Sequence, residues 1–468
     1  MIVRTLVATL LASAAMVPAS AQVLRPDQSA FRALYQELVE TNTTLSVGSC
    51  TDAAAKMGAR LKAAGFADND ITYFSTPEHP KDGGLVAVLK GSDSRIKPML
   101  LLAHLDVVEA KREDWTRDPF KLIEENGFFY ARGAEDDKAM AAVWTDAMIR
   151  FRQEGYKPKR TIKLALTCGE ETTYAFNGAE WLAKNRPELI AAEFALNEGG
   201  GGQLDTSGKK IALAMQVGEK AVQNYRIEAI NPGGHSSRPT PDNAIYELAD
   251  ALRAVRMYEF PTKFTDTTRV FFAQTGKSVG GEMGSAITAL LANPNDAAAD
   301  RIVSSDPTYH SMLRTTCVAT LLDGGHANNA LAQRAGANIN CRIFPGETNV
   351  TTRDALAAAI NDPKITITMT LPIRPIAKPP SLDAKIMEPA TAVAKAHFPG
   401  IPILPLMSTG ATDGIFLEAI GIPVYGVPGI FGEFDFNGIH GLNEHLRVSS
   451  LYEGRDYLFD LVKVYASK

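Results

Sequence analysis

Apolar residues recur along the chain with the two spacings that distinguish helices from strands. Between residues 31 and 65 the spacing is helical, as shown by Phe31, Leu34, Leu38, Met57 and Leu61. Further on, short apolar runs alternate with helical patterns. We expect strands at 85–90, 99–103, 161–167 and 193–196, and helices at 138–151 and 178–184. This alternation predicts an α/β fold with a mostly parallel sheet covered by helices.

A different pattern begins near residue 218. It predicts strands at 223–230, 314–322 and 330–344 and helices at 243–256 and from 352, with a polar, irregular stretch between the first helix and the later strands. The α/β pattern resumes with a helix from 382 to 395, a strand at 422–427 and a final helix from 451. A chain of 468 residues is long enough for two domains. We therefore predict a main domain over 22–217 and 376–468, and an inserted α+β domain over 218–375.

The first 21 residues have the pattern of a secretory signal peptide. Arg4 precedes an apolar run from Thr5 to Val17, and Ala19-Ser20-Ala21 supplies the small residues of a cleavage site. The run is shorter than the roughly 20 residues that a membrane-spanning helix needs. We expect cleavage after Ala21 and export to the periplasm or the medium, with no membrane span elsewhere.

Composition excludes few classes of protein. A hydrophobic content of 45% and a charged content of 22% are ordinary for an enzyme, and the net charge of −5 gives no electrostatic reason to expect nucleic acid as a partner. The four cysteines are Cys50, Cys168, Cys317 and Cys341, and none has CxxC spacing. A bond between Cys317 and Cys341, in strands that could be neighbours, is one interpretation. Four packed thiols are the other.

Residues of the types that bind metals follow three of the predicted strands. His104 and Asp106 follow the first, Glu170-Glu171 the second and Glu198 the third. In open α/β sheets the ligand site lies beyond the carboxyl ends of the strands, and imidazole and carboxylate groups suit zinc. The acidic triplet at 135–137 opens the helix from 138, where helix capping is the alternative explanation.

In this order the motifs resemble those of the zinc aminoacylase and carboxypeptidase family, which includes carboxypeptidase G, aminoacylase and succinyl-diaminopimelate desuccinylase. The matching pieces are His104-Leu105-Asp106, Gly133-Ala134-Glu135-Asp136-Asp137-Lys138, Glu170-Glu171, Glu198 and His440-Gly441-Leu442-Asn443-Glu444. The resemblance covers the chain that remains after cleavage. It is strongest to the branch of Gly-Xaa carboxypeptidases and N-fatty-acyl-amino-acid hydrolases, through Gly234-His235-Ser236-Ser237-Arg238-Pro239 and Asn340-Cys341-Arg342-Ile343-Phe344-Pro345-Gly346.

The resemblance implies a centre of two Zn²⁺ ions, or of another divalent metal such as Co²⁺ or Mn²⁺. Its ligands would be Asp136 as the bridge, His104 and Glu198 at one ion, and Glu171 and His440 at the other. Asp106 would orient the His104 ring, and Glu170 would be the general base. The resemblance also implies a cis peptide bond between Asp136 and Asp137. Because Asn197 stands where this branch has Asp, either Asn197 or Glu198 could contact the metal.

The resemblance further implies substrate contacts from the inserted domain, which would act as a lid. His235 would donate to the carbonyl oxygen as it becomes an oxyanion, from the partner subunit in dimeric relatives; a turn histidine is the alternative. Arg342 would hold the free carboxylate of the substrate, with Asn329 beside it. Thr409, Gly410 and Thr412 resemble a substrate-contacting loop, although a glycine-rich helix entry that ends at Asp413 would explain them equally well.

The implied function is that of an exported di-zinc metallohydrolase that cleaves the amide bond before a C-terminal amino acid. The substrate would be a small peptide or an N-acyl amino acid, with an acyl pocket shaped by an inserted helical stretch from about 260 to 311. A homodimer through the lid domain is expected. One alternative is a two-zinc aminopeptidase, which would have no use for Arg342. Another is a non-catalytic binding protein, which should lack Glu170 or one of the ligands.

Overall fold

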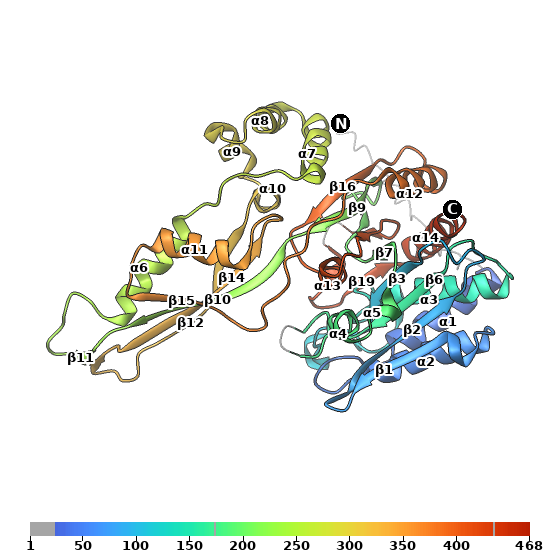
Figure 1. The fold of residues 1–468 in the computed structure, drawn as a ribbon, viewed down its shortest axis with the longest axis horizontal. Coiled ribbons are helices and arrows are strands. Elements are labelled where there is room, and N and C mark those ends of the chain that lie inside the picture. Colours follow the sequence, from blue (N-terminus) through green and yellow to red (C-terminus); the bar gives the residue numbers. More distant parts are fainter. Residues whose placement is uncertain (1–23, 173–174, 434–435) are drawn as a thin grey trace, which may run out of the picture.

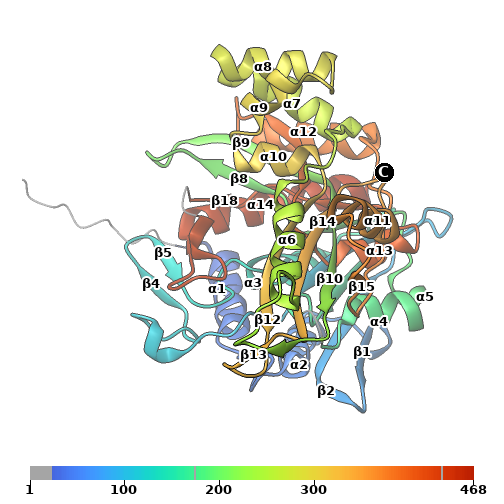
Figure 2. The same cartoon turned by 90° about the vertical axis from the view of Figure 1, so that its left-hand side faces the viewer.

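The computed structural model describes residues 24–172, 175–433 and 436–468, so the signal-peptide segment lies outside the described residues. The chain forms a broad α/β domain from which a narrow lid domain extends to one side (Figure 1), and the second view looks along this lid towards the α/β domain (Figure 2). Within the described ranges, no helix is both long enough and apolar enough to cross a bilayer.

The α/β domain is built on a ten-stranded sheet in the order β1-β2-β6-β3-β7-β17-β9-β8-β18, with β16 also paired to β9. The strands are β1 (Ile71–Thr76), β2 (His79–Leu89), β3 (Met99–His104), β6 (Ile162–Thr167), β7 (Phe194–Asn197), β8 (Gly201–Leu204), β9 (Lys210–Glu219), β16 (Ile403–Ser408), β17 (Val424–Gly426) and β18 (Phe431–Gly432). Its central strands β6, β3, β7 and β17 run parallel. Every residue of β3 is buried, as its continuous apolar run requires.

Helices cover both faces of this sheet. One face packs against α1 (Pro26–Val39), α2 (Cys50–Ala63), α3 (Lys138–Gln153), α12 (Ala384–His397) and α14 (Val448–Ala466). The other packs against α4 (Gly178–Asn185), α5 (Pro187–Ile190) and α13 (Gly414–Ala419). The predicted fold class, a mostly parallel sheet covered by helices, is therefore confirmed.

The lid domain has a four-stranded sheet in the order β12-β14-β10-β15. Its elements are β10 (Ala221–Ile230), α6 (Ala244–Met257), β12 (Thr316–Gly324), β14 (Arg334–Ile343), α11 (Asn349–Ile360) and β15 (Ile365–Met369). Burial alternates strictly along β10, so one face of the sheet packs against α6 and α11 while the other stays more open. At the far tip, β11 (Gly234–His235) pairs with β13 (Ala330–Leu331) (Figure 1).

The stretch between α6 and β12 contains four helices, so its interpretation as helical from about 260 to 311 is confirmed and its description as irregular is wrong. They are α7 (Asp266–Val279), α8 (Gly281–Ala292), α9 (Ala297–Val303) and α10 (Pro307–Leu313). Three of them start at side-chain caps formed by Thr265, Asp296 and Asp306, whose polarity resembles that of a loop. They share a small core around Phe272 and pack against Met407 of β16.

Smaller elements complete the α/β domain. A three-stranded sheet joins β4 (Ile123–Glu125), β5 (Phe128–Tyr130) and β19 (His445–Arg447), and three single turns of 3₁₀ helix occur at η1 (Asp68–Asp70), η2 (Arg112–Asp114) and η3 (Phe436–Gly438). The β19–β5 pairing is important for the site because it brings residues 440–444 against residues 131–136.

Both pairs of cysteines form disulfide bonds. Cys317 and Cys341 are direct neighbours on β12 and β14, so the disulfide interpretation holds and that of four packed thiols is wrong. The second bond joins Cys50, the first residue of α2, to Cys168, the residue after β6. No sequence pattern pairs these two residues, which are 118 positions apart.

Candidate metal-dependent active site

The candidate site lies at one edge of the central sheet. Strands β3, β6 and β7 are parallel neighbours, so their carboxyl ends meet. His104 ends β3, Glu170 and Glu171 follow β6, and Glu198 follows β7. The structure thus brings together the residues that the sequence placed after three separate strands.

Asp136 lies between two imidazole rings. Its Oδ1 is 3.2 Å from Nε2 of His104, and its Oδ2 is 3.1 Å from Nε2 of His440. On the outer sides, Nε2 of His104 is 3.8 Å from Oε1 of Glu198, and Nε2 of His440 is 2.9 Å from Oε1 of Glu171. All five residues that the family resemblance proposes as ligands therefore meet, in the arrangement expected of a bridging carboxylate and two flanking pairs.

Two overlapping groups have potential ligand atoms within 4.8 Å of one another: one is His104, Asp136 and Glu171, and the other is His104, Asp137 and Glu198. Asp137 occupies the N-cap position of α3 but makes no side-chain capping bond. Its Oδ2 instead accepts a hydrogen bond of 3.3 Å from the backbone N–H of His104. The capping explanation therefore does not account for Asp137, whose carboxylate faces the site.

The loop that carries Asp136 is held by Glu444. This buried carboxylate accepts hydrogen bonds from the backbone N–H groups of Gly133, Glu135 and Asp136 at 2.9, 2.9 and 3.2 Å, and from Nη1 of Arg132 at 2.8 Å. The expected cis peptide bond between Asp136 and Asp137 is present. In the sequence, Glu444 is only the last residue of the motif at 440–444. The structure shows that it binds the backbone of the loop that carries Asp136.

Asp106 contacts two of the candidate ligands. Nδ1 of His104 lies 3.0 Å from the backbone oxygen of Asp106 and 3.6 Å from its Oδ1, while Oδ2 accepts a hydrogen bond of 3.0 Å from the N–H of Glu171. Both ring nitrogens of His104 face oxygen atoms, Nδ1 those of Asp106 and Nε2 the carboxylate of Asp136. If Nε2 binds a metal ion, Nδ1 carries the ring proton and donates it to Asp106. This is the contact that an orienting role requires.

Asn197 points away from the candidate ligands. Its Nδ2 donates a hydrogen bond of 3.2 Å to Oγ1 of Thr412. Thr412 in turn donates from both its N–H and its hydroxyl to Oε2 of Glu219, at 3.0 and 2.9 Å. Of the two neighbouring positions, Glu198 is therefore the one directed at His104. Glu219 was not among the expected site residues, because no strand was predicted at β9, whose last residue is Glu219.

Glu170 lies beside the candidate ligands without belonging to either ligand group. Burial raises the pKa of its carboxyl group well above the usual value; the carboxylates of Asp413 and Glu171 add to this effect, and His104 opposes it. Asp413 itself accepts hydrogen bonds from Nδ2 of Asn177 at 2.6 Å and from Oγ1 of Thr167 at 3.0 Å. A carboxyl group that readily holds a proton next to a metal centre suits proton transfer.

Arg342 lies near the end of β14 that is closer to the catalytic domain. Burial lowers the pKa of this half-buried guanidinium, and the charges of Glu170 and Glu219 partly oppose the shift. Among the described residues, none forms a hydrogen bond or an ion pair with the Arg342 side chain. Thr409 and Gly410 lie half-buried in the turn between β16 and α13, where the N–H of Gly410 donates to Oγ of Ser408 at 3.0 Å.

Comparison with known proteins identifies the family of this chain. The model of peptidase family M20/M25/M40 matches residues 100–464. The chain belongs to this family. Human N-fatty-acyl-amino acid synthase/hydrolase PM20D1 is 27% identical over 434 residues, which cover 91% of this chain and 85% of the relative. The probable carboxypeptidase S-like 2 of Dictyostelium discoideum is 27% identical over 390 residues, or 81% and 74% of the two chains.

Among solved structures, the M20 family metallo-carboxypeptidase Sso-CP2 of Sulfolobus solfataricus has the same fold. Its TM-score is 0.69 at 18% identity, with 95% of this chain and 100% of that chain covered. The protein is therefore an M20 enzyme of the carboxypeptidase and amidohydrolase type. The suspected family and the suspected branch are both confirmed.

Two residues that the resemblance gave to the active site of this M20 enzyme lie at the tip of the lid. His235 is exposed on β11, where its Nδ1 accepts a hydrogen bond of 3.2 Å from the N–H of Ser237. Asn329 is beside it, because its backbone oxygen accepts a hydrogen bond from the N–H of Ser236. Our expectation that Asn329 lies beside Arg342 is wrong within one chain, since Asn329 is at the tip of the lid and eight residues of β14, from 334 to 341, precede Arg342.

Proposed function

We propose that the protein is a two-metal hydrolase that cleaves the amide bond before a C-terminal amino acid with a free carboxylate. The observation that carries this proposal is Arg342, a permanently charged and half-buried side chain that no described residue pairs with, placed within electrostatic reach of Glu170. A buried guanidinium is costly to leave unpaired. Its planar donors match a carboxylate, so the C-terminal carboxylate of a substrate is a fitting partner.

The residues present fit a pair of zinc ions. Imidazole and carboxylate are the ligands that zinc takes in catalytic sites. His104 and Glu198 would hold one ion, His440 and Glu171 the other, and Asp136 would contribute one oxygen to each. When bound, zinc supplies Lewis acidity that polarises a carbonyl group and acidifies water. Co²⁺ and Mn²⁺ also accept these ligands.

Three parts of the chain have distinct tasks in this proposal. Asp106 holds the ring of His104 through Nδ1 and the N–H of Glu171 through Oδ2. Glu170 removes a proton from the attacking water and delivers it to the leaving amine. Arg342 holds the carboxylate of the leaving amino acid and fixes the scissile bond relative to Glu170. The turn with Thr409, Gly410 and Thr412 would border the space that the substrate occupies.

A second copy of the chain would complete the site. Strand β12 is an unpaired edge of the lid sheet, and three of its large apolar side chains, Val318, Leu321 and Leu322, are 59%, 70% and 70% exposed. An exposed apolar edge strand readily pairs with another strand. Because His235 lies at the tip of the lid, far from the catalytic domain of its own chain (Figure 1), it would act in the active site of the partner.

We also propose that the protein is exported. The apolar segment at 5–17, followed by Ala19-Ser20-Ala21, supports this localisation. Two disulfide bonds among the described residues add support, because such bonds persist in oxidising compartments.

The test is product analysis with the purified, zinc-loaded protein. N-acyl amino acids, Gly-Xaa dipeptides and longer blocked peptides would be supplied, and we expect release of a free C-terminal amino acid that a chelator abolishes. The preferred acyl group then decides between a carboxypeptidase and an N-acyl-amino-acid hydrolase, the activity for which the human relative is named. Release of N-terminal residues instead would establish the aminopeptidase alternative.

A matched pair of substrates tests the role of Arg342. For substrates with a free C-terminal carboxylate, Arg342→Ala should raise KM by about 10- to 100-fold, the equivalent of a lost charge-assisted hydrogen bond. For the same substrates with an amidated C-terminus, wild type and variant should be equally poor. An unchanged KM for the free acid would exclude Arg342 as the carboxylate-binding residue.

A further inference from the structure

A disulfide bond lies directly behind the candidate metal centre. Cys168 follows β6 and immediately precedes Gly169, Glu170 and Glu171, while Cys50 begins α2. Both half-cystines are buried. The bond therefore joins the segment that carries the proposed base to a helix on one face of the sheet.

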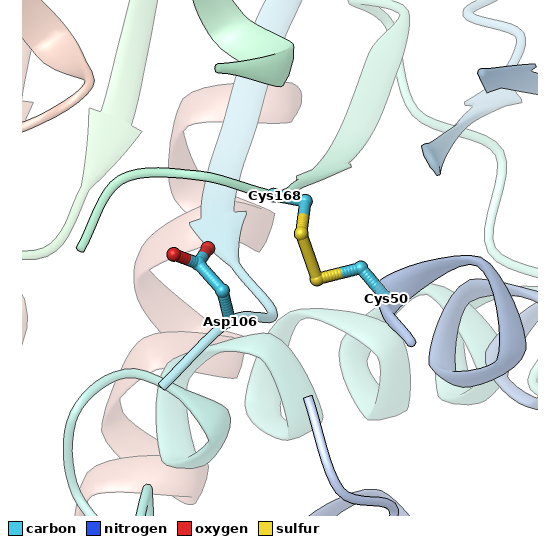
Figure 3. Close-up of side chains that lie close together, drawn as sticks. All are labelled: Cys50, Asp106 and Cys168. Atoms are coloured by element: carbon cyan, nitrogen blue, oxygen red, sulfur yellow. A yellow bond between two sulfur atoms is a disulfide. The ribbon is translucent and has the colours of Figure 1, made fainter. Parts of the chain in front are cut away.

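The carboxylate of Asp106 lies against this bond. Potential ligand atoms of Cys50, Asp106 and Cys168 are all within 4.8 Å of one another, and Figure 3 shows the three side chains together. Since both sulfur atoms are in a disulfide, they offer no thiolate, and this group is not a further metal site. Asp106 instead has the disulfide on one side and His104 and Glu171 on the other.

The same short segment is held on its other side by the start of α4. The backbone oxygen of Cys168 accepts a hydrogen bond of 2.7 Å from the N–H of Gly178, and that of Gly169 accepts one of 3.1 Å from Nδ2 of Asn177. Gly169 has a φ of +95°, and a Cβ there would approach the backbone oxygen of Phe176 to 1.8 Å. The chain at 168–169 thus passes through a confined space that leaves it little freedom.

The beginning of α2 is held by its own cap and by strand β2. Ser49 accepts a hydrogen bond from the N–H of Asp52, and the hydroxyl of Thr51 donates to the backbone oxygen of Pro80 at 2.8 Å and accepts from the N–H of Gly83 at 2.9 Å. The loop before α2 contacts the site through Thr43, whose hydroxyl donates to the backbone oxygen of Leu105 at 2.7 Å. The disulfide is the covalent connection between this helix start and the catalytic segment.

We propose that the Cys50–Cys168 disulfide is a positioning element of the metal centre. It keeps the start of α2 and the end of β6 together around Asp106, so that Asp106 holds the ring of His104 and the backbone of Glu171 in the orientation that metal binding needs. The proposal rests on the proposed function, since it takes His104 and Glu171 as ligands. Groups that orient metal ligands typically change metal affinity or activity by 10- to 100-fold when removed.

The chain contains its own control for this proposal. Cys317–Cys341 is a second cross-link, with Cys341 buried and Cys317 partly buried, but it joins adjacent strands of the lid. Cys341 has its side chain on the face of β14 opposite to that of its neighbour Arg342. Losing either disulfide should lower the free energy of unfolding, whereas only the loss of Cys50–Cys168 should change the metal centre.

The experiment compares C50A/C168A with C317A/C341A in the full-length protein. Zinc affinity is measured by competition with a chromophoric chelator, the Co²⁺ absorption spectrum reports ligand geometry, and hydrogen exchange is followed at residues 168–172. For C50A/C168A we expect 10- to 100-fold weaker zinc binding, an altered Co²⁺ spectrum and faster exchange at 168–172. The same quantities should stay within about twofold of wild type in C317A/C341A, within the scatter of neutral substitutions.

Wild-type zinc affinity, spectrum and exchange in a folded C50A/C168A protein would overturn the proposal, as would equal changes in both variants. If C50A/C168A does not fold, folded wild-type protein is treated with a trialkylphosphine, which converts each disulfide and one water into two thiols and a phosphine oxide. Mass spectrometry then identifies which bond was reduced, and the same three measurements apply. Because exchange and metal binding need no substrate, they decide the question even if no amide is hydrolysed.

Discussion

At the scale of single residues, the site is organised by carboxylates with different partners. Asp136 faces two imidazole rings, Asp106 faces one ring and one backbone N–H, and Glu170 belongs to neither ligand group. Identical chemical groups therefore take different roles because of what surrounds them. This difference makes Glu170 the residue whose removal should separate catalysis from metal binding.

Glu170→Gln should retain both metal ions and lose about 10²- to 10⁴-fold in kcat, the usual contribution of a general base. The amide keeps the shape of the side chain but cannot accept the proton. Metal content by atomic absorption and kcat on the preferred substrate are the two measurements. A variant with normal metal content and nearly normal kcat would assign the base to another group.

Glu219 should make stability depend on pH. Burial raises the pKa of its carboxyl group from 4.5 to about 7, despite hydrogen bonds from Thr412 and Gln216 that favour the ionised form. The folded protein therefore still holds a proton that the unfolded chain has already released between these two values. Stability from this proton is complete below pH 4.5 and is lost as the pH rises through about 7, by roughly 3 kcal/mol in total.

The check is denaturant unfolding of wild type and Glu219→Gln at pH 5 and pH 7.5. Glutamine does not titrate, so the variant should lack this loss, and the difference in free energy of unfolding between the two proteins should shift in favour of the variant as the pH rises. Parallel pH profiles would mean that Glu219 is ionised in the folded protein throughout this range.

At the scale of elements, the sequence predicted those whose pattern is strong and local. The apolar run of β3 and the amphipathic α3 were expected, and the residues after β3, β6 and β7 converge because parallel strands share an edge. The helices α7–α10 were expected only as one helical stretch without boundaries, since three of the four begin at polar caps that resemble loop residues. The sequence also could not reveal that Asn329 lies at the tip of the lid while Arg342 lies near the other end of β14, because no local pattern encodes that distance.

The exposed edge strand β12 gives a prediction about assembly. Leu321→Lys should convert a dimer into a monomer, because a buried lysine opposes strand pairing at this edge. Ile211→Lys, on β9 of the α/β domain, is a matched control with an exposed apolar residue and should leave the molecular mass unchanged. Light scattering after gel filtration measures both. A monomeric wild-type protein would contradict the proposed interface.

Action of His235 in the partner subunit can be tested by mixing. His235→Ala and Glu170→Gln should each be nearly inactive alone, but a hybrid dimer has one site with an intact Glu170 and an intact partner histidine. A 1:1 mixture after subunit exchange should therefore recover about a quarter of wild-type activity, since half of the dimers are hybrids with one active site each. Activity no greater than the sum of the separate variants would show that His235 does not act across the dimer.

At the scale of the whole molecule, the metal centre joins distant parts of the chain. His104 and His440 come from the two sequence segments of the catalytic domain that flank the lid. Glu444 holds the loop that carries Asp136 through hydrogen bonds to its backbone. Without metal, the carboxylates of Asp136, Glu171 and Glu198 lie close together around the rings of His104 and His440. Metal binding should therefore stabilise the folded domain as well as activate it.

Removing zinc with a chelator should lower Tm by several degrees, since a ligand at 100 times its Kd contributes about 2.7 kcal/mol. Calorimetry of the zinc-loaded and zinc-free forms measures the shift, and adding Zn²⁺ back should restore it. In His440→Ala the shift should be smaller, because one ion loses a ligand. Identical Tm values with and without zinc in wild type would show that zinc binding does not stabilise the folded domain.

The position of β17 has a consequence for how the protein is made. This strand lies between β7 and β9 in the middle of the sheet, yet it consists of Val424–Gly426, near the end of the chain. A ribosome has therefore synthesised the entire lid and most of the catalytic domain before the central sheet can close. His440 emerges later still, so a nascent or prematurely terminated chain has no complete metal centre. Loading of both metal positions must therefore follow synthesis of His440.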